Sequence, residues 1–281
     1  MKYVVITPVK NERDFIRFTL DSVISQSLQP EEWIIVDDGS TDNTVEIIRS
    51  YQQQIPWIKL VQLNTHAEKK LYGSKVIHAF NEGLKNVQKK YDFIVKLDAD
   101  LTLPSNYFEE VARCFSEYPK VGICGGYTVE KQGDFEAKQK MSDYVQGPIK
   151  SVRKECFAAI GGFIEENGWD GFDQLHAMYL GWEVRHIPLA VIHHRIPTTE
   201  YRSLSLFFNN GKTHYRLGNN FFLTLVRTLF RIFEKPYILG SLSYFSGWMT
   251  SYINRAERLV DKDLAKFIRK YHYRRILSSK R

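Results

Sequence analysis

The stretch "DFIVKLDADLTLP", residues 92–104, decides the fold. Its apolar run at 93–97, interrupted only by Lys96, predicts a buried strand that leads directly into Asp98 and Asp100. Side chains alternate along an extended strand, so both carboxylates face the same way. Two carboxylates this close repel each other unless a cation lies beside them, and Mg²⁺ or Mn²⁺ prefers such oxygen ligands. The stretch therefore predicts a divalent metal site at the end of a core strand.

The sequence around this stretch alternates strand and helix patterns. Continuous apolar runs predict strands at residues 3–9, 32–38, 58–63 and 91–98, and amphipathic patterns predict helices at 39–51, 73–87 and 105–119. Such alternation is typical of an α/β domain with a mainly parallel sheet flanked by helices. In open sheets of this kind, ligands bind outside the carboxyl ends of the strands. Asp98 and Asp100 lie at such an end.

A second acidic strand end occurs in "IIVDDGSTD", residues 34–42. Asp37 and Asp38 terminate an apolar run, and a carboxylate at this position can accept hydrogen bonds from a nucleotide base or a ribose. Alternatively, Asp37 or Asp42 bonds nearby backbone N–H groups in an Asx-turn that caps the next helix. Both interpretations remain open.

The patterns in residues 130–195 are less regular. Residues 130–147 are polar and predict a loop, and "GPIKSVRKECF" at 147–157 predicts a loop that enters a helix N-terminus. Another helix is expected from Trp169–Asp170 to Gly181, followed by a short strand towards His193 and His194.

Composition indicates a globular chain with two electrostatically different parts. The 281 residues are 43% hydrophobic, enough for a full core, and three cysteines without paired spacing favour neither a disulfide framework nor a zinc site. No apolar leader precedes the first strand, so we expect a cytoplasmic protein. Residues 1–200 hold 23 Lys and Arg against 28 Asp and Glu, a net of −5, whereas residues 201–281 hold 16 against 4, a net of +12. We therefore expect one domain at 1–200 and a separate helical extension at 201–281.

The C-terminal extension is aromatic as well as basic. No charge occurs between Lys235 and Arg255, but the Ser, Gly and Tyr residues there argue against a spanning helix. One interpretation is a helix in the membrane interface, with Arg227, Arg231 and the basic C-terminal end towards lipid phosphates. The other is helices packed on the catalytic domain, with a solvated basic end.

Four segments together resemble a known family. "TPVKNE", "VDDGSTDNT", "KLDADL" and "GWDGFD", in this order and at these intervals, are similar to the family-2 glycosyltransferases with the GT-A fold. The resemblance covers residues 1–195, and the combination is far more specific than a lone Asp-x-Asp. It implies an inverting enzyme that uses a nucleotide-sugar donor and a divalent cation.

The resemblance assigns nucleotide-binding roles at the first two strand ends. Thr7, Pro8 and the adjoining backbone would frame the nucleotide base of a UDP- or GDP-sugar. Asp38, and with it Asp37, would hydrogen-bond the base.

The resemblance also assigns residues near the donor phosphates. Lys75 would lie near the phosphates, Asp98 would contact the ribose, sugar or metal, and Asp100 would bind Mn²⁺ or Mg²⁺ on the diphosphate. His193 or His194 could complete the metal shell, although adjacent strand residues point to opposite faces, so only one can reach the site. A structural histidine is the alternative for each.

Arg153 and Lys150 are further candidates for phosphate neutralisation. Both precede the expected helix N-terminus, where anions bind readily, and the planar fork of Arg153 suits diphosphate oxygens. A surface role is the alternative for Lys150.

An inverting transfer also needs a base for the acceptor hydroxyl. In the family, this base opens a helix, which places it at Asp170, with Asp173 on the same helical face as the second candidate. A purely structural role for Asp170 as a helix N-cap is the alternative.

The sequence thus predicts a metal-dependent, inverting glycosyltransferase that acts on a saccharide or lipid-linked saccharide, in cell-envelope polysaccharide or glycolipid synthesis. The +12 extension raises the possibility of a peripheral position on the anionic inner face of the cell membrane. A sugar-phosphate nucleotidyltransferase is one competing hypothesis, but the segment after the first strand lacks the glycine-rich loop that such enzymes carry. A non-enzymatic nucleotide- or nucleic-acid-binding module is another. The aromatic residues of the extension form apolar clusters that suit packing or lipid better than base stacking, so no nucleic-acid partner is expected.

Overall fold

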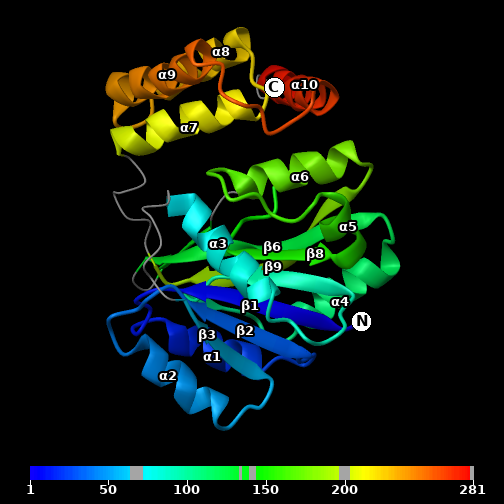
Figure 1. Cartoon of the computed structure of the whole chain (residues 1–281). Coiled ribbons are helices and arrows are strands. Elements are labelled where there is room, and N and C mark those ends of the chain that lie inside the picture. Colours follow the sequence, from blue (N-terminus) through cyan, green and yellow to red (C-terminus); the bar gives the residue numbers. More distant parts are fainter. Residues whose placement is uncertain (64–71, 133–134, 139–143, 196–202, 279–281) are drawn as a thin grey trace. The chain divides into compact units, whose positions relative to one another are not determined.

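The computed structural model describes residues 1–63, 72–132, 135–138, 144–195 and 203–278. The chain divides into two compact units (Figure 1). Unit 1 contains Met1–Glu165 and Trp169–Ile196, and unit 2 contains Glu166–Gly168 and Pro197–Arg281. Each unit has its own buried interior.

Unit 1 is built on one sheet in the order β3-β2-β1-β4-β8-β6-β9-β5, with β7 paired to β6. β1 to β4 run parallel, as the sequence predicts, whereas β8 lies antiparallel between β4 and β6. β9 pairs parallel with β6 and antiparallel with β5. The strands are β1 Tyr3–Val9, β2 Glu32–Asp37, β3 Ile58–Gln62, β4 Phe93–Leu97, β5 Leu101–Thr102, β6 Val121–Gln132, β7 Phe135–Lys138, β8 Ile149–Arg153 and β9 Glu183–His193.

Helices cover both faces of this sheet, because side chains of the buried parallel strands alternate between two apolar clusters. Tyr3 and Val5 of β1 pack with α1 and α4 on one face, and Val4 and Ile6 pack with α3, α5 and α6 on the other. The helices of unit 1 are α1 Ile16–Ile24, α2 Thr44–Gln52, α3 Tyr72–Leu84, α4 Tyr107–Glu117, α5 Lys154–Ala159 and α6 Trp169–Tyr179. This arrangement confirms the predicted α/β fold.

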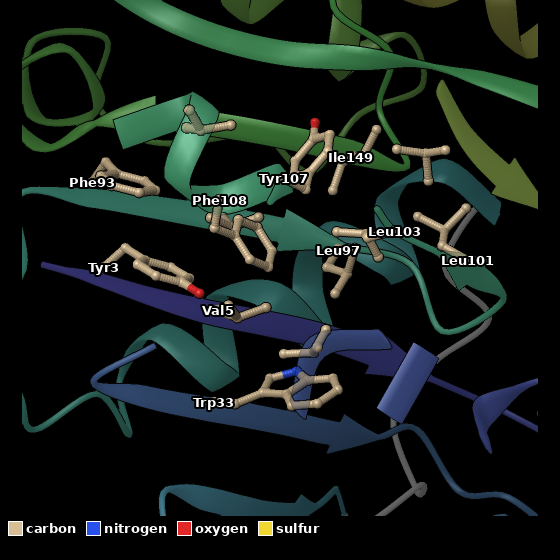
Figure 2. Packing of buried hydrophobic residues seen from close by; sticks show 14 of the residues in the cluster. Tyr3, Val5, Trp33, Phe93, Leu97, Leu101, Leu103, Tyr107, Phe108 and Ile149 are labelled. Atoms are coloured by element: carbon tan, nitrogen blue, oxygen red, sulfur yellow. The ribbon is translucent and has the colours of Figure 1, made fainter. Parts of the chain in front are cut away.

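Aromatic rings anchor the first cluster at the amino ends of β1 and β4 (Figure 2). Tyr3 stacks on Phe93 with ring centroids 5.0 Å apart and contacts Phe108 at 4.7 Å. Because this end of the sheet is filled with rings, the chemistry-bearing residues lie at the opposite, carboxyl end.

Two predictions about the middle of the chain were wrong. Part of the segment 130–147, predicted as a loop, is strand: β6 extends to Gln132 and pairs with β7. Lys150 and Arg153 lie on β8 and not on a loop before a helix. β8 is the antiparallel strand beside β4, and its charged residues hide its strand character in the sequence.

Unit 2 is helical: α7 Leu204–Arg216, α8 Phe221–Arg231, α9 Tyr237–Ile253 and α10 Lys262–Ser278. α7 and α9 approach closely at two glycines. A Cβ at Gly211 would lie 2.0 Å from the Tyr244 carbonyl oxygen, and one at Gly247 would lie 1.9 Å from the Phe208 carbonyl oxygen. In the described part of the chain, no helix combines the length and apolar character needed to cross a membrane.

Candidate active site

The carboxyl ends of β1, β2 and β4 form one acidic edge of the sheet. In the parallel register, Val9 at the end of β1 lies beside Asp37 at the end of β2, and Ile6 lies beside Lys96 of β4. Asp38, Asp98 and Asp100 follow directly on these strand ends. We use the term acidic edge for Asp37, Asp38, Asp98 and Asp100.

Asp37 and Asp38 differ in their surroundings. Asp37 is buried, and its carboxylate accepts hydrogen bonds from the Ser40 N–H at 3.1 and 3.3 Å, which is the turn geometry considered for it from sequence. Asp42 likewise accepts from the Thr44 N–H at 3.0 Å. Asp38 is half-buried and lies 3.8 Å from the ammonium group of Lys10. Its carboxylate therefore remains open to a ligand.

Thr7 and Pro8 form the last part of β1. The Thr7 side chain is buried, and its hydroxyl accepts a hydrogen bond from the Trp33 indole N–H at 2.9 Å. Pro8 pairs in register with Val36 and is partly exposed. The Thr7 hydroxyl serves the core, so only backbone atoms at this position suit a base-binding role.

Asp98 is held by a buried lysine of its own strand. The Lys96 ammonium group forms an ion pair with Asp98 and lies 5.5 Å from the centre of the Trp169 ring. The Asp98 N–H donates to the Pro148 carbonyl oxygen at 2.8 Å. Burial raises the pKa of the Asp98 carboxyl, Lys96 opposes this, and the nearby charge of Asp100 raises it further.

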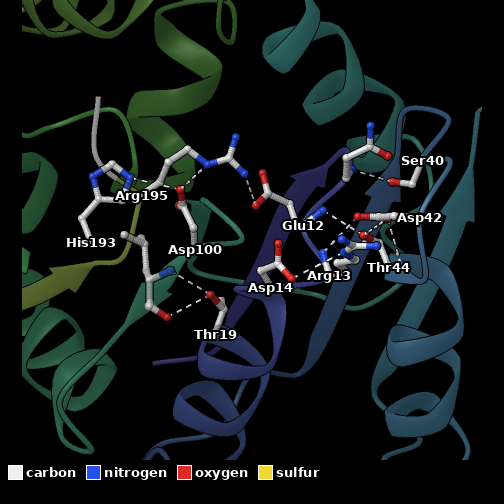
Figure 3. Close-up of polar contacts among 12 residues, drawn as sticks. Glu12, Arg13, Asp14, Thr19, Ser40, Asp42, Thr44, Asp100, His193 and Arg195 are labelled. Carbon is white, nitrogen blue, oxygen red and sulfur yellow. Dashed lines mark hydrogen bonds and ion pairs between the residues drawn. The ribbon is translucent and has the colours of Figure 1, made fainter. Parts of the chain in front are cut away.

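Asp100 faces two cationic side chains from the end of β9 (Figure 3). One carboxylate oxygen, Oδ2, lies 3.2 Å from His193 Nε2 and 3.4 Å from Arg195 Nε. Burial raises the pKa of Asp100, but the hydrogen bond and charge of His193, together with Arg195, outweigh it and leave the pKa below its usual value. Asp100 is therefore a carboxylate at neutral pH.

The other oxygen of Asp100 provides the test of whether a metal fits. Asp100 Oδ1 is buried and has no hydrogen-bond partner among the residues that the structure describes. A buried, unpaired carboxylate oxygen is costly unless something positive binds it, and an oxygen-seeking divalent cation suits it. Within the described residues, no group of three or more His, Cys, Asp or Glu side chains is arranged to hold a metal ion. A metal ion bound here would be held by a small set of ligands centred on Asp100.

Asp170 and Asp173 have different environments on α6. Asp173 is buried, and both of its oxygens accept from the Lys150 ammonium group, at 2.9 and 2.7 Å. Lys150 also donates to the Asp170 backbone carbonyl at 2.6 Å. Burial raises the pKa of Asp173 to about 7 against the attraction of Lys150. Asp173 is therefore engaged inside unit 1, and its position does not favour contact with an acceptor.

The Asp170 side chain is partly exposed at the start of α6. The helix begins at Trp169, so Asp170 lies within the first turn and is not the N-cap. A Cβ built on Gly147 would lie 3.3 Å from Asp170 Oδ2. Gly147 precedes Pro148, whose carbonyl oxygen binds the Asp98 N–H. Asp170 and Asp98 therefore lie next to the same pair of residues, and the structure brings the expected base to the acidic edge.

Three other predicted residues lie elsewhere or serve other contacts. Arg153 pairs in register with Phe93, at the amino end of β4, and its guanidinium donates to the carbonyl oxygens of Phe115, Tyr118 and Val121. Arg153 therefore does not reach the acidic edge. The Lys150 ammonium group is engaged by Asp170 and Asp173 of α6. His194 bonds Thr102 Oγ1 at 2.7 Å.

Lys75 is exposed on α3. The residues before α3, 64–71, are outside the described part of the chain, as are residues 139–143. The structure therefore leaves the predicted phosphate role of Lys75 as a prediction.

Comparison with known proteins identifies the family. The model described as "Glycosyl transferase family 2" matches residues 4–164, more than half of the chain. This chain belongs to glycosyl transferase family 2. The acidic edge lies within the matched residues.

Several curated relatives of this glycosyltransferase are longer proteins. It is 31% identical over 135 residues to the minor teichoic acid biosynthesis protein GgaA of Bacillus subtilis, a match that covers 46% of this chain and 29% of that protein. It is 34% identical over 116 residues to a poly-beta-1,6-N-acetyl-D-glucosamine synthase of Staphylococcus epidermidis, covering 41% of this chain and 26% of that one. The glycosyltransferase thus matches under a third of either relative. An uncharacterized glycosyltransferase of Haemophilus influenzae is 24% identical over 284 residues, covering 95% of this chain and 97% of that protein.

Solved structures confirm the GT-A fold of this glycosyltransferase. S. aureus TarS 1–349 in complex with UDP-GlcNAc superposes with a TM-score of 0.59 at 17% identity, covering 92% of this chain and 76% of that one. The mannosyltransferase PcManGT of Pyrobaculum calidifontis, in complex with GDP-Man and Mn²⁺, superposes with a TM-score of 0.57 at 18% identity, covering 97% and 79%.

Sequence reasoning did not single out three charged residues of this glycosyltransferase. Arg195 forms an ion pair with Glu12 as well as approaching Asp100 (Figure 3). Lys96 forms an ion pair with Asp98. Burial raises the pKa of Glu12 to about 7, although Arg195 lowers it and Asp100 adds to the rise. Glu12 ends the segment "TPVKNE", which resembles the family, and Lys96 is a charged residue within an apolar strand. Both residues could therefore have been recognised from the sequence. Arg195 could not have been recognised in this way, because its partner Glu12 lies 183 residues away in the sequence.

Proposed function

We propose that this enzyme is a metal-dependent, inverting glycosyltransferase that moves a sugar from a UDP- or GDP-sugar to a hydroxyl group of a saccharide or lipid-linked saccharide. The observation that carries the proposal is the acidic edge, where Asp98 and the buried Oδ1 of Asp100, unpaired among the described residues, lie near a partly exposed carboxylate, Asp170. Donor and metal are supported by analogy, since neighbours in fold bind UDP-GlcNAc or GDP-Man and Mn²⁺.

The residues suited to hold the cation are Asp100 and Asp98, with His193 oriented on Asp100 at 3.2 Å. Bound Mn²⁺ or Mg²⁺ would neutralise the charge that develops on the departing nucleoside diphosphate. Few protein ligands suffice because such ions share their coordination with substrate phosphates. Asp38, half-buried at the end of β2, would accept hydrogen bonds from the nucleotide base.

Asp170 is proposed as the general base. It would take the proton from the acceptor hydroxyl as that oxygen attacks the anomeric carbon, while the bond to the diphosphate breaks on the opposite face. One displacement of this kind inverts the configuration. Lys150 holds the backbone carbonyl of Asp170 at 2.6 Å and binds Asp173, so the pair fixes the first turn of α6 that presents the base.

We further propose a role in cell-envelope polysaccharide synthesis, on the basis of the name of the B. subtilis relative. In this proposal residues 1–200 form the catalytic domain, and residues 201–281 bring a cytoplasmic enzyme to the anionic inner face of the membrane. The net +12 of that extension supports the localisation.

Thermal unfolding with nucleotides tests the donor and metal. We expect UDP or GDP together with Mn²⁺ to raise the melting temperature more than either alone, because ligands of the folded state stabilise it. Asp100→Ala should remove the metal-dependent part. An unchanged shift in Asp100→Ala, or a shift produced by an oligonucleotide alone, would contradict the proposal.

Transfer assays test the base. Asp170→Asn should keep the donor- and metal-dependent shift but lower the turnover number by at least about 100-fold. Asp173→Asn is the matched comparison, since it removes a buried carboxylate on the same helix. Full activity of Asp170→Asn would return Asp170 to a structural role.

A further inference from the structure

The helices α8 and α9 of unit 2 carry large apolar side chains on their outer sides. On α8 and in the connection that follows it, Phe222, Leu225, Leu229 and Phe233 recur at helical spacing, and all are exposed. α9 exposes a comparable set at Ile238, Leu242 and Ile253. We call these seven residues the apolar stripes. Exposed apolar side chains that recur in this way mark an interaction surface.

The inward sides of the same helices combine a few large side chains with small and polar ones. α8 buries Leu223, Thr224 and Thr228, and α9 buries Gly240, Ser241, Tyr244, Gly247, Trp248 and Ser251. Helices of water-soluble bundles normally bury most of their large apolar residues and expose the polar ones. α8 and α9 instead leave most of their large apolar residues exposed, with small residues at the helix contacts as in helices that pack within lipid.

The buried hydroxyl groups need no partner outside their own helix. Thr228 Oγ1 donates to the Thr224 carbonyl oxygen at 2.8 Å, and Thr224 Oγ1 donates to the Asn220 carbonyl oxygen at 2.9 Å. The small residues let the helices approach closely, as Gly247 does against the Phe208 carbonyl. Leu223, Tyr244 and Trp248 fill the interior together with these small residues, and the residues of the apolar stripes remain exposed and available for a partner.

Basic residues lie beside the apolar stripes. α10 exposes Lys262, Lys266, Lys270 and Arg274, each four residues after the last, so they form a row on one side of the helix. Tyr273 of α10 lies next to the start of α8, with its ring centroid 6.1 Å from that of Phe222 and its hydroxyl 2.9 Å from Asn220 Oδ1.

The arginines expected from sequence to face lipid do not do so. Arg227 lies 3.4 Å from the His214 ring nitrogens, and the Arg231 guanidinium lies over the rings of Phe207 and Tyr244. Both point into unit 2. The exposed cationic groups of unit 2 include those of α10, together with Lys235 and Arg255 on either side of α9.

We propose that the apolar stripes of α8 and α9 insert into the interface of an anionic lipid bilayer, while the basic row of α10 binds the phosphates of its headgroups. Figure 1 shows α8 and α9 on the same side of α7, so both can meet one surface. The inference deepens the proposed membrane localisation and rests on it. No described helix is able to span a bilayer, which fits insertion parallel to the surface.

Charge decides between a bilayer and a second copy of the chain. Residues 203–278 hold 13 Lys and Arg against 4 Asp and Glu, a net of +9. Pairing two copies through these helices would bring two such charges together, which is unfavourable. An anionic bilayer offers both an apolar layer and negative charge, so it complements the surface in both respects.

Vesicle co-sedimentation of the full chain tests the inference. We expect the protein to sediment with phosphatidylcholine vesicles that contain about 30 mol% phosphatidylglycerol and to remain in solution with phosphatidylcholine alone. Salt at about 1 M should weaken binding, because it screens the headgroup charge over a few ångströms.

Two sets of variants separate the apolar and basic contributions. Leu229→Gln with Leu242→Gln, at residues 54% and 56% exposed, should lower the partition coefficient by at least about tenfold. The matched control is Leu180→Gln, at a residue 44% exposed in unit 1, which should leave it unchanged.

The second set replaces Lys266, Lys270 and Arg274 by Gln, and should lower the partition coefficient by on the order of 100-fold, since each cation near an anionic surface contributes substantially. Replacing Lys85, Lys89 and Lys90 by Gln removes the same charge from unit 1 and should have a much smaller effect. Circular dichroism of every variant verifies the fold.

Each alternative outcome overturns a defined part of the membrane proposal. If the wild-type chain does not bind anionic vesicles, both the surface and the proposed localisation fail. If it binds but the Leu229→Gln, Leu242→Gln variant binds equally, the surface fails and the localisation stands. If gel filtration shows a dimer that this variant dissociates, the stripes join two copies of the chain. None of these results depends on the donor-binding shift, which tests the transferase proposal separately.

Discussion

The Lys150–Asp173 ion pair places two charges in the interior of unit 1, where both side chains are nearly inaccessible to water. Such a pair gains little over an apolar replacement, but losing one partner leaves an uncompensated buried charge. Here the pair also fixes the backbone of Asp170, the proposed base, through a third bond from Lys150. At the residue scale, a structural charge therefore determines the position of the proposed catalytic one.

This pair gives the free energy of unfolding a defined pH dependence. The folded pKa of Asp173 is about 7, above the unfolded value near 4, so the folded protein binds the additional proton between these limits. Asp173 should therefore lower the free energy of unfolding by roughly 2 to 4 kcal/mol as pH rises from about 4 to about 7. Urea denaturation across this range should show a flatter dependence in Asp173→Asn, and an identical slope would contradict the assignment.

Removing Lys150 tests the same ion pair through its other partner, because it leaves the Asp173 carboxylate without its cation. Lys150→Met leaves Asp173 buried without its cation, and we expect a loss of about 3–5 kcal/mol at pH 8. The loss should be smaller at pH 5.5, because Asp173 can then take up a proton. The double variant Lys150→Met, Asp173→Leu is the control and should be more stable than Lys150→Met alone at pH 8.

At the scale of elements, the strands that the sequence predicts correctly are those with continuous apolar runs. β1, β2 and β4 are buried on both faces, so nearly every residue is apolar and the pattern is visible. β8 was missed because it contains Lys150 and Arg153, whose burial depends on partners in other elements. Lys150 meets Asp173 on α6, and Arg153 meets carbonyl groups near the end of α4. No local pattern reports such contacts.

The candidate site divides in the same way. Asp98, Asp100 and Asp170 could be predicted because each ends a strand or begins a helix, where sequence patterns change. The Arg195–Glu12 contact joins residues near the first and the last positions of unit 1 in the sequence, so only the folded structure reveals it. Arg153 was assigned to a loop, whereas it lies on β8 opposite Phe93, at the amino end of β4.

The contact between α7 and α9 gives a test of element packing. Gly247→Ala would place a Cβ 1.9 Å from the Phe208 carbonyl oxygen, so the helices must separate, and we expect unit 2 to lose about 1–3 kcal/mol of stability. Gly171→Ala on α6 is the matched control, because nothing lies within 4 Å of its added Cβ. That change should be neutral or stabilise by up to about 1 kcal/mol. Equal effects on the melting temperature would contradict the packing argument.

At the scale of the whole molecule, the two units differ in charge and in the ligands proposed for them. Unit 1 contains the acidic edge, whereas residues 201–281 carry a net charge of +12, and most of the exposed large apolar side chains of the described residues lie in unit 2. We therefore expect UDP with Mn²⁺ to slow amide hydrogen exchange at the carboxyl ends of β1, β2 and β4 and to leave α8–α10 unchanged. Anionic vesicles should do the opposite. Protection of α8–α10 by the nucleotide alone would contradict this division.

The outward-facing leucines and phenylalanines of α8 and α9 bear on how the enzyme would meet its acceptor. A protein held at a bilayer searches by lateral diffusion in two dimensions, and its effective concentration towards a lipid-linked acceptor is far above that in solution. Leu229→Gln should therefore raise the apparent KM for an acceptor embedded in vesicles and leave the kinetics with a short water-soluble analogue unchanged. Substrate preference for membrane-borne saccharides would then arise from shared residence on one surface, without any added contact to the sugar.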